Sequence, residues 1–170
     1  MIEPAITLRP FEHGDIEQYR SWINDPETMR LLGRHSHVSR EEHEEWYGRL
    51  QLSPAVLVRA IVATGDYVGN VWLWDRDVRN RKAEVRIVIG PRLHRGLGLG
   101  SRALREITAV AFEQEQLHRL YAYVLEYNPV ALHTFLRAGF RLEGILHHDR
   151  FLSGEYYSTY LLSLCQGERR

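Results

Sequence analysis

The pattern of hydrophobic and polar positions predicts short strands and amphipathic helices along the whole chain. In the first half, apolar residues alternate with polar ones or form short β-branched runs, which is typical of strands. Between two of these runs, Gly65-Asp66 is a hairpin signal. The strands predicted in this half are Ile6–Arg9, Leu57–Thr64, Tyr67–Trp74 and, after the charged turn Asp75–Lys82, Ala83–Ile89.

Two helices are predicted between the first two strands. The first begins at Asp15, which can form a capping box with Gln18, and ends at Asp25-Pro26. The second begins with a capping box of Ser39 and Glu42. Their apolar faces are expected to be buried: Ile16, Tyr19 and Ile23 in the first helix, and Trp46, Tyr47 and Leu50 in the second.

The second half alternates strands with helices. A helix after Gly100 carries one apolar stripe, and a second helix begins at Asn128-Pro129 and has Gly139 at its C-terminal cap. The stripe consists of Ala103, Leu104, Ile107, Val110 and Ala111, and the predicted strands are Leu120–Leu125, Phe140–Ile145 and Tyr156–Leu164. A strand, a helix and a strand of these lengths imply a right-handed crossover and a parallel pair. The predicted fold is therefore α/β: one domain over residues 1–170, with a mixed, mostly antiparallel sheet and one central parallel pair flanked by helices.

The turn between the predicted strand Ala83–Ile89 and the helix after Gly100 carries the strongest chemical signal. Glycines occupy alternate positions 96, 98 and 100, after a strand and before a helix. Free backbone amides at a helix start bind phosphate, and glycines let an anion approach them. A P-loop is excluded because no lysine precedes Ser101. A dinucleotide fingerprint can be read at Gly98, Gly100 and Ala103, but it lacks an acidic residue about 20 positions on.

The same turn fits the pattern Arg/Gln-x-x-Gly-x-Gly/Ala, filled by Arg95, Gly98 and Gly100. Here the chain resembles the GNAT superfamily of N-acetyltransferases. The resemblance extends to Asn128–Phe140, which is similar to the family's Asn-x-x-Ala…Gly-Phe segment. The opening segments Leu8–Phe11 and Trp22–Asp25 resemble the branch with ribosomal-protein N-terminal and spermidine acetyltransferases.

The resemblance implies a fold whose parallel strand pair splays apart, and a site for acetyl-CoA within that gap. The backbone of Ile87, Val88 and Ile89 would bind pantetheine and polarise the thioester carbonyl. Asn128 would be a cofactor ligand, a helix cap, or both. The turn implied to hold the pyrophosphate comprises Arg95, Gly96, Leu97, Gly98, Leu99, Gly100 and Ser101.

Glu84 is the candidate general base. An alkylammonium with a pKa near 10 is mostly protonated at pH 7, so acetyl transfer to an amine needs a group that removes a proton. Glu84 precedes the implied acyl-binding part of its strand. The alternative is an ion pair with Arg86, which alternation places on the same face of the sheet.

The protonation of the departing thiolate is where the chain departs from the family. The family's tyrosine, seven residues after the asparagine, is Phe135 here, and the serine of the ribosomal-protein branch is Ala131. Phe135 is expected near the sulfur end of coenzyme A. His133 and Tyr160 are candidate replacement donors, although thiols with a pKa near 8.5 also leave without help.

Composition excludes several other functions. The 22 basic and 22 acidic side chains balance, which argues against a nucleic-acid surface or a polybasic membrane contact. The single cysteine and the lack of a signal peptide or long apolar run predict a cytoplasmic protein. The nine histidines, among them His35 and His37 and the pair His147-His148, have no ligand spacing and are expected on the surface, so no metal is predicted. A serine hydrolase is not indicated either, because the sequence contains no Gly-x-Ser-x-Gly elbow.

Three functions therefore compete. The leading hypothesis is an acetyl-CoA-dependent N-acetyltransferase acting on a primary amine: a protein N-terminus, a polyamine, an amino sugar or another small amine. A polyamine would need several carboxylates, which Glu41, Glu42, Glu44 and Glu45 can supply unless they form a solvated helix face. The alternatives are a non-catalytic acyl-CoA-binding or sensing module and, more weakly, a nucleotide-dependent oxidoreductase. Aromatic residues suit a core, the acceptor pocket or a homodimer surface.

Overall fold

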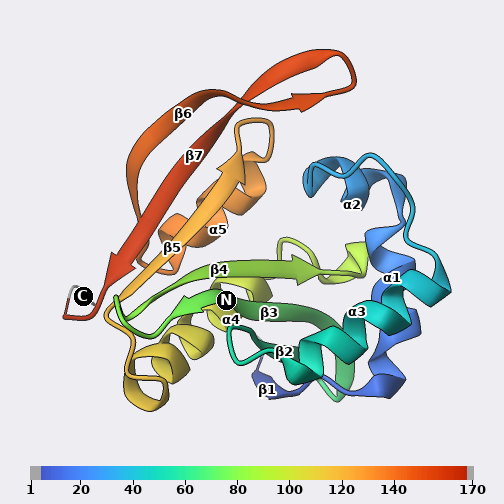
Figure 1. Cartoon of the computed structure of the whole chain (residues 1–170), viewed down its shortest axis with the longest axis horizontal. Coiled ribbons are helices and arrows are strands. Elements are labelled where there is room, and N and C mark those ends of the chain that lie inside the picture. Colours follow the sequence, from blue (N-terminus) through green and yellow to red (C-terminus); the bar gives the residue numbers. More distant parts are fainter. Residues whose placement is uncertain (1–4, 168–170) are drawn as a thin grey trace.

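One sheet organises the described residues 5–167 of the computed structural model (Figure 1). Its strands are β1 (Ile6–Pro10), β2 (Leu57–Ala63), β3 (Asp66–Asp77), β4 (Lys82–Ile89), β5 (Arg119–Leu125), β6 (Arg141–Leu152) and β7 (Glu155–Cys165). They lie in the order β1-β2-β3-β4-β5-β7-β6, and all neighbours are antiparallel except β4 and β5. The predicted mixed sheet with one parallel pair is confirmed.

Helices cover both faces of this sheet. The helical elements are η1 (His13–Asp15), α1 (Ile16–Ile23), α2 (Pro26–Leu31), α3 (Arg40–Leu52), η2 (Arg92–His94), α4 (Leu99–Ala109), its π-helical continuation η3 (Val110–Gln114) and α5 (Pro129–Arg137). In Figure 1, α1 and α3 lie in front of the sheet while α4 and α5 lie behind it. The helix α2 stands apart from them, opposite the end of β5.

Each face of the sheet has its own core. The main core joins the strands to α4 and α5 and contains the predicted stripe of α4, with Ala103, Leu104 and Ile107 fully buried. The second core joins the strands to α1 and α3 and contains Ile16 and Trp72. Alternation along β4 divides its side chains between the two cores, as period-2 geometry requires.

The parallel pair separates after a short ladder. Register partners are found only from Lys82–Glu84 of β4 to Arg119–Tyr121 of β5. Beyond this ladder, β4 continues along β3 as far as Ile89, and β5 continues along β7 as far as Leu125. The strands therefore open a gap in the middle of the sheet, which is the splay that the family resemblance implied.

Local capping signals account for most element ends. The Ser39–Glu42 capping box forms, with Ser39 Oγ accepting from Glu42 N at 3.1 Å. Asn128 caps α5, and Gly139 follows that helix at φ +100°. The predicted Asp15–Gln18 box is wrong, because Asp15 instead accepts hydrogen bonds from the backbone of Glu12 and the guanidinium of Arg9.

Two further elements differ from the prediction. The chain forms a short helix, α2, where only the end of the first helix was expected. Asp25 caps it, accepting from Thr28 N at 3.0 Å, and Pro26 occupies its first position. The strand β6 reaches Leu152 instead of Ile145, through an irregular stretch between Leu146 and Arg150. The β6–β7 hairpin therefore extends well beyond the rest of the sheet (Figure 1).

Candidate active site

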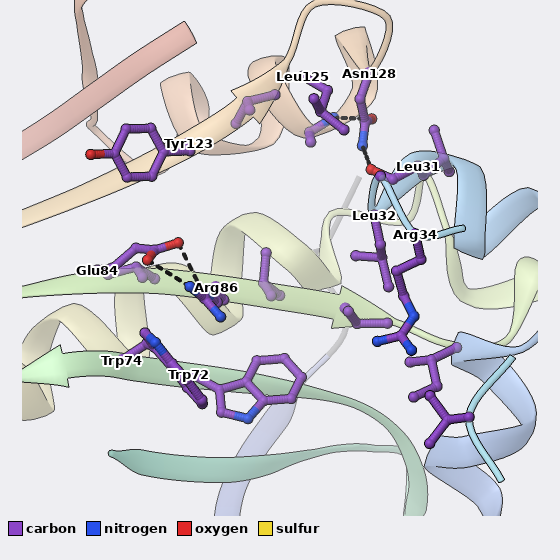
Figure 2. Close-up of a pocket in the computed structure, with 18 of the residues that line it drawn as sticks. Leu31, Leu32, Arg34, Trp72, Trp74, Glu84, Arg86, Tyr123, Leu125 and Asn128 are labelled. Atoms are coloured by element: carbon purple, nitrogen blue, oxygen red, sulfur yellow. Dashed lines mark hydrogen bonds and ion pairs between the residues drawn. The ribbon is translucent and has the colours of Figure 1, made fainter. Parts of the chain in front are cut away.

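A cavity of about 720 Å³ passes through the gap between β4 and β5 (Figure 2). Its wall includes Glu84, Arg86 and Val88, which face α1 and α3, and also Val85 and Ile87, which face the main core. Because both faces of β4 contribute, the cavity connects the two sides of the sheet. The rest of its wall comes from α1, the segment after α2, α3, β3, β5 and α5, with single residues of β6 and β7.

Glu84 lies in this cavity as one half of an ion pair. Its two carboxylate oxygens accept hydrogen bonds from Arg86 Nε and Nη2, each at 2.8 Å. The guanidinium of Arg86 lies 4.5 Å above the ring of Trp74. The predicted pairing with Arg86 is therefore confirmed, and it fixes the carboxylate of Glu84 at the point where the strands begin to separate (Figure 2).

The glycine-rich turn leads from the end of β4 into α4. Gly96 and Gly98 have φ of +77° and +82°, a region that other residues adopt only at a cost. Gly98 is the N-cap of α4 and offers no side chain to the first amides of the helix. These amides are therefore available to an anion, as the sequence predicts. A glycine at position 100 is explained by packing, since a Cβ there would lie 2.9 Å from Thr134 Cγ2 of α5.

Arg95 is engaged within the protein. Its guanidinium donates to the carbonyl oxygens of Ile89 and Gly90 at 3.1 and 3.0 Å and to Thr28 Oγ1 at 2.8 Å. It also faces the carboxylate of Glu27 at 3.5 Å. The side chain thus ties the glycine-rich turn to α2 and is not free to bind an anion, so any anion site at this turn would be built from its backbone. Ser101 likewise donates inward, to Gly98 O at 3.0 Å.

The predicted acyl-binding stretch of β4 has ordinary core side chains. Ile87 and Ile89 pack against the main core, and Val88 belongs to the second core. On the side toward β5, however, the backbone of this stretch has no strand partner beyond Glu84. Its free backbone groups border the cavity, so any function of these residues lies in their main chain.

The helix α5 brings two of the predicted residues to the cavity and leaves one outside. Asn128 accepts from Ala131 N at 3.0 Å and donates to Leu31 O at 3.4 Å, so it caps α5 while lining the cavity. Phe135 also lines it, with 4% of its surface exposed and its ring edge-on to Phe140 at 5.1 Å. His133 is exposed on the outer side of the helix and is not part of the wall.

Tyr160, the other candidate proton donor, is not among the residues that line the cavity either. It packs against the main core, and its neighbour Thr159 is the residue of β7 that lines the cavity. Tyr123 of β5 is a cavity residue that the sequence analysis did not single out. It is 44% exposed, and in Figure 2 it lies across the gap from Glu84. The signal that would have indicated it is the alternation along β5, where Tyr121 and Tyr123 take turns with buried apolar residues and so lie on the other face of the strand.

His43 corrects the expectation that the histidines lie on the surface. Only 2% of it is exposed, it stacks on Trp46 at 4.9 Å, and neither ring nitrogen has a hydrogen-bond partner among the described residues. Burial first, and then the charges of Arg20 and Arg34, lower the pKa of His43. The signal was present in the sequence, since His43, Trp46 and Leu50 recur on one face of α3.

The acidic residues of α3 do not gather at the cavity. Of the four considered, only Glu42 lines it, while Glu44 pairs with His13 and Glu45 with Arg49. Within residues 5–167, no three potential metal ligands come together, and no helix is long and apolar enough to cross a membrane.

Comparison with known proteins yields consistent similarities. The sequence profile of the acetyltransferase (GNAT) domain matches residues 5–141. The spermidine N(1)-acetyltransferase of Escherichia coli K12 is 26% identical over 95% of this chain and 87% of its own length. That of Vibrio cholerae is 28% identical over 96% and 94%. The crystal structure of spermidine N-acetyltransferase from Vibrio cholerae with CoA and spermine superimposes with a TM-score of 0.90, covering 96% of both chains at 26% identity.

Proposed function

Because this chain belongs to the GNAT acetyltransferase family and is an acetyl-CoA-dependent N-acetyltransferase, we propose that the cavity between β4 and β5 is its active site, with Glu84 as the general base. The observation that carries this proposal is the path of the cavity. It joins the unpaired edge of β4 to the carboxylate of Glu84 through the gap in the sheet. A thioester on one side can therefore meet an amine on the other.

Two stretches of backbone would bind different parts of the cofactor. The amides of the turn from Arg95 to Ser101, at the start of α4, would hold the pyrophosphate, and the positive φ of Gly98 keeps that backbone open. The free main chain of Ile87, Val88 and Ile89 would pair with pantetheine as a neighbouring strand does. Asn128 borders the same cavity and orders the start of α5.

The reaction is a direct transfer. The neutral amine attacks the thioester carbonyl carbon, the C–N bond forms, and the C–S bond breaks with its electrons leaving on sulfur. Glu84, directly or through a water molecule, takes the proton that the ammonium must lose. The ion pair with Arg86 holds this carboxylate in one orientation, so that it stays in position to accept the proton from the bound amine.

The thiolate leaves beside an apolar wall. Phe135 lines the cavity where the family has a tyrosine, and a phenyl ring donates no proton. Tyr123 replaces Tyr160 as our proposed donor, because Tyr123 lines the cavity and Tyr160 packs in the main core. The similarity to named acetyltransferases does not favour the alternative of a non-catalytic sensing module.

The names of the relatives bear on the amine acceptor and on the oligomeric state. The relatives are named for spermidine, which makes a polyamine one candidate acceptor. A cytoplasmic location and a homodimer stay predictions. A Vibrio cholerae spermidine N-acetyltransferase with a TM-score of 0.82, 26% identity and 96% and 95% coverage of the two chains is described as dodecameric.

The variant Glu84→Gln tests the proposal. It keeps the shape that faces Arg86 but removes the proton acceptor, so turnover should fall by about 10²–10⁴-fold while the KM for acetyl-CoA stays the same. The defect should shrink as pH rises toward the pKa of the amine, because the neutral amine then forms without a base. Glu41→Gln, on the exposed face of α3, is the control. Wild-type turnover of Glu84→Gln at neutral pH would remove Glu84 from this role.

A further inference from the structure

The charged side chains of the cavity do not balance one another. Those that line it within the described residues are Glu42, Glu84, Arg34, Arg86 and Arg150. Glu84 and Arg86 neutralise each other. Glu42 accepts from Ser39 N at 2.7 Å at the start of α3, and Arg150 lies 3.4 Å from Asp149. Arg34 is the one of these five side chains to which the described residues give neither an ion pair nor a hydrogen bond.

Arg34 projects into the cavity without an anionic partner. It follows α2, and Figure 2 shows its guanidinium directed between α1 and the end of β4. Its Nε is buried and has no hydrogen-bond partner, and no carboxylate among residues 5–167 forms an ion pair with it. Its buried Nε therefore lacks a hydrogen bond, and an arginine gains most from two parallel hydrogen bonds to a carboxylate or phosphate.

The surroundings of Arg34 favour a negatively charged ligand. His43 lines the same cavity, and its imidazole, whose pKa is lowered by burial, adds no anionic group that would compete for Arg34. A polycation meets the opposite conditions. Each additional ammonium would need a carboxylate, and the cavity provides only Glu42, because Glu84 is already paired with Arg86.

Taking the proposed active site as given, we propose that the acceptor is a small amine that also carries a carboxylate or a phosphate, and that Arg34 binds this anion. In Figure 2, Glu84 and Arg34 lie toward opposite ends of the drawn stretch of β4. An acceptor that spans this stretch presents its amine to Glu84 and its anion to Arg34. The aromatic rings of Trp72 and Trp74, on β3, form the floor between them.

Matched acceptors test the charge preference. The pairs are 4-aminobutyrate against 1,4-diaminobutane, and glucosamine 6-phosphate against glucosamine, with spermidine as the polycation. The first pair probes a carboxylate source and the second a phosphate source. We expect the anionic member of at least one pair to have the higher kcat/KM, by about tenfold or more. The proposal is overturned if spermidine or the members without an anionic group are the better acceptors.

The variant Arg34→Gln assigns the preference to its residue. Losing one charge-assisted contact should lower kcat/KM for the acceptor with the anionic group by about 10–100-fold, with little change for its partner without that group or in the KM for acetyl-CoA. Arg40→Gln makes the same change of net charge on an exposed position outside the cavity and is the control. A rise in the KM for acetyl-CoA alone would assign Arg34 to the cofactor and refute the proposal. If no amine is acetylated although coenzyme A binds, the proposed function fails instead.

Discussion

Gly69 of β3 lies against β4 at a point where no side chain fits. A Cβ built at this position would be 2.1 Å from the carbonyl oxygen of Val88 and 3.1 Å from Ile89 Cα. Both contacts are with backbone, so no rotamer change can relieve them. The substitution Gly69→Ala must therefore push β4 away from β3, toward the gap in the sheet.

The expected magnitude follows from these distances. Nonbonded heavy atoms prefer separations near 3.5 Å, so β4 has to move by about 1 Å. Overpacking of this kind costs about 1–3 kcal/mol, and the lower entropy of the unfolded alanine chain offsets about 0.4–1 kcal/mol of it. We expect the free energy of unfolding to fall by about 1–2 kcal/mol. A shift of 1 Å in the main chain that would hold pantetheine should also lower kcat/KM for acetyl-CoA by up to about 10²-fold.

Denaturant unfolding and steady-state kinetics measure the two effects. Gly48→Ala is the matched control, because Gly48 lies inside α3 and a Cβ there meets nothing within 4 Å. It should raise stability by about 0.5–1 kcal/mol and leave the kinetics unchanged. A Gly69→Ala protein with wild-type stability and kinetics would refute the reasoning.

Two other predictions concern the thiolate and the pH dependence of stability. Phe135→Tyr adds a phenol to the cavity wall where the chain has an apolar ring, so turnover should rise or at least not fall in a stopped assay of released coenzyme A, and a fall in turnover would contradict this. Hydrogen bonds from Arg119 and then Ser163 lower the pKa of Glu143 to about 2 in the folded protein. A carboxyl group with a lowered pKa stabilises the fold at every pH above the pKa it has in the unfolded chain. This contribution is therefore complete above about pH 4.5 and is lost as pH falls toward 2. Since the pair is about one-third exposed, the loss should be only about 1 kcal/mol in unfolding experiments. Glu143→Gln should remove this part of the pH dependence, and an unchanged profile would show that the pair contributes nothing.

The order of elements and the position of the glycine-rich turn before α4 could be predicted from the sequence because both depend on local signals. Alternation located β4, periodicity located α4, and Gly98 marked the position where φ must be positive. The sequence analysis predicts no helix at α2 although Asp25-Pro26 is a good helix start, because a proline at this position also marks the end of the preceding helix.

Other features depend on contacts between distant segments, which no local pattern records. The strands β4 and β5 are of similar length, so nothing in them shows that their ladder stops at Glu84. The engagement of Arg95 needs Thr28, 67 positions earlier, to be folded against it. The position of Arg34 likewise depends on how the segment after α2 folds over the sheet.

The short ladder between β4 and β5 also makes the proposed cofactor site visible to amide hydrogen exchange. Along a strand, amide protons point alternately to its two neighbours, so from Val85 to Ile89 every second amide of β4 points into the gap rather than to β3. These protons should exchange with deuterium much faster than those bonded to β3 while the gap is open to water. Coenzyme A would slow them and leave the β3-bonded set almost unaffected. A single strand would then report, amide by amide, both the stability of the fold and the occupancy of its catalytic gap.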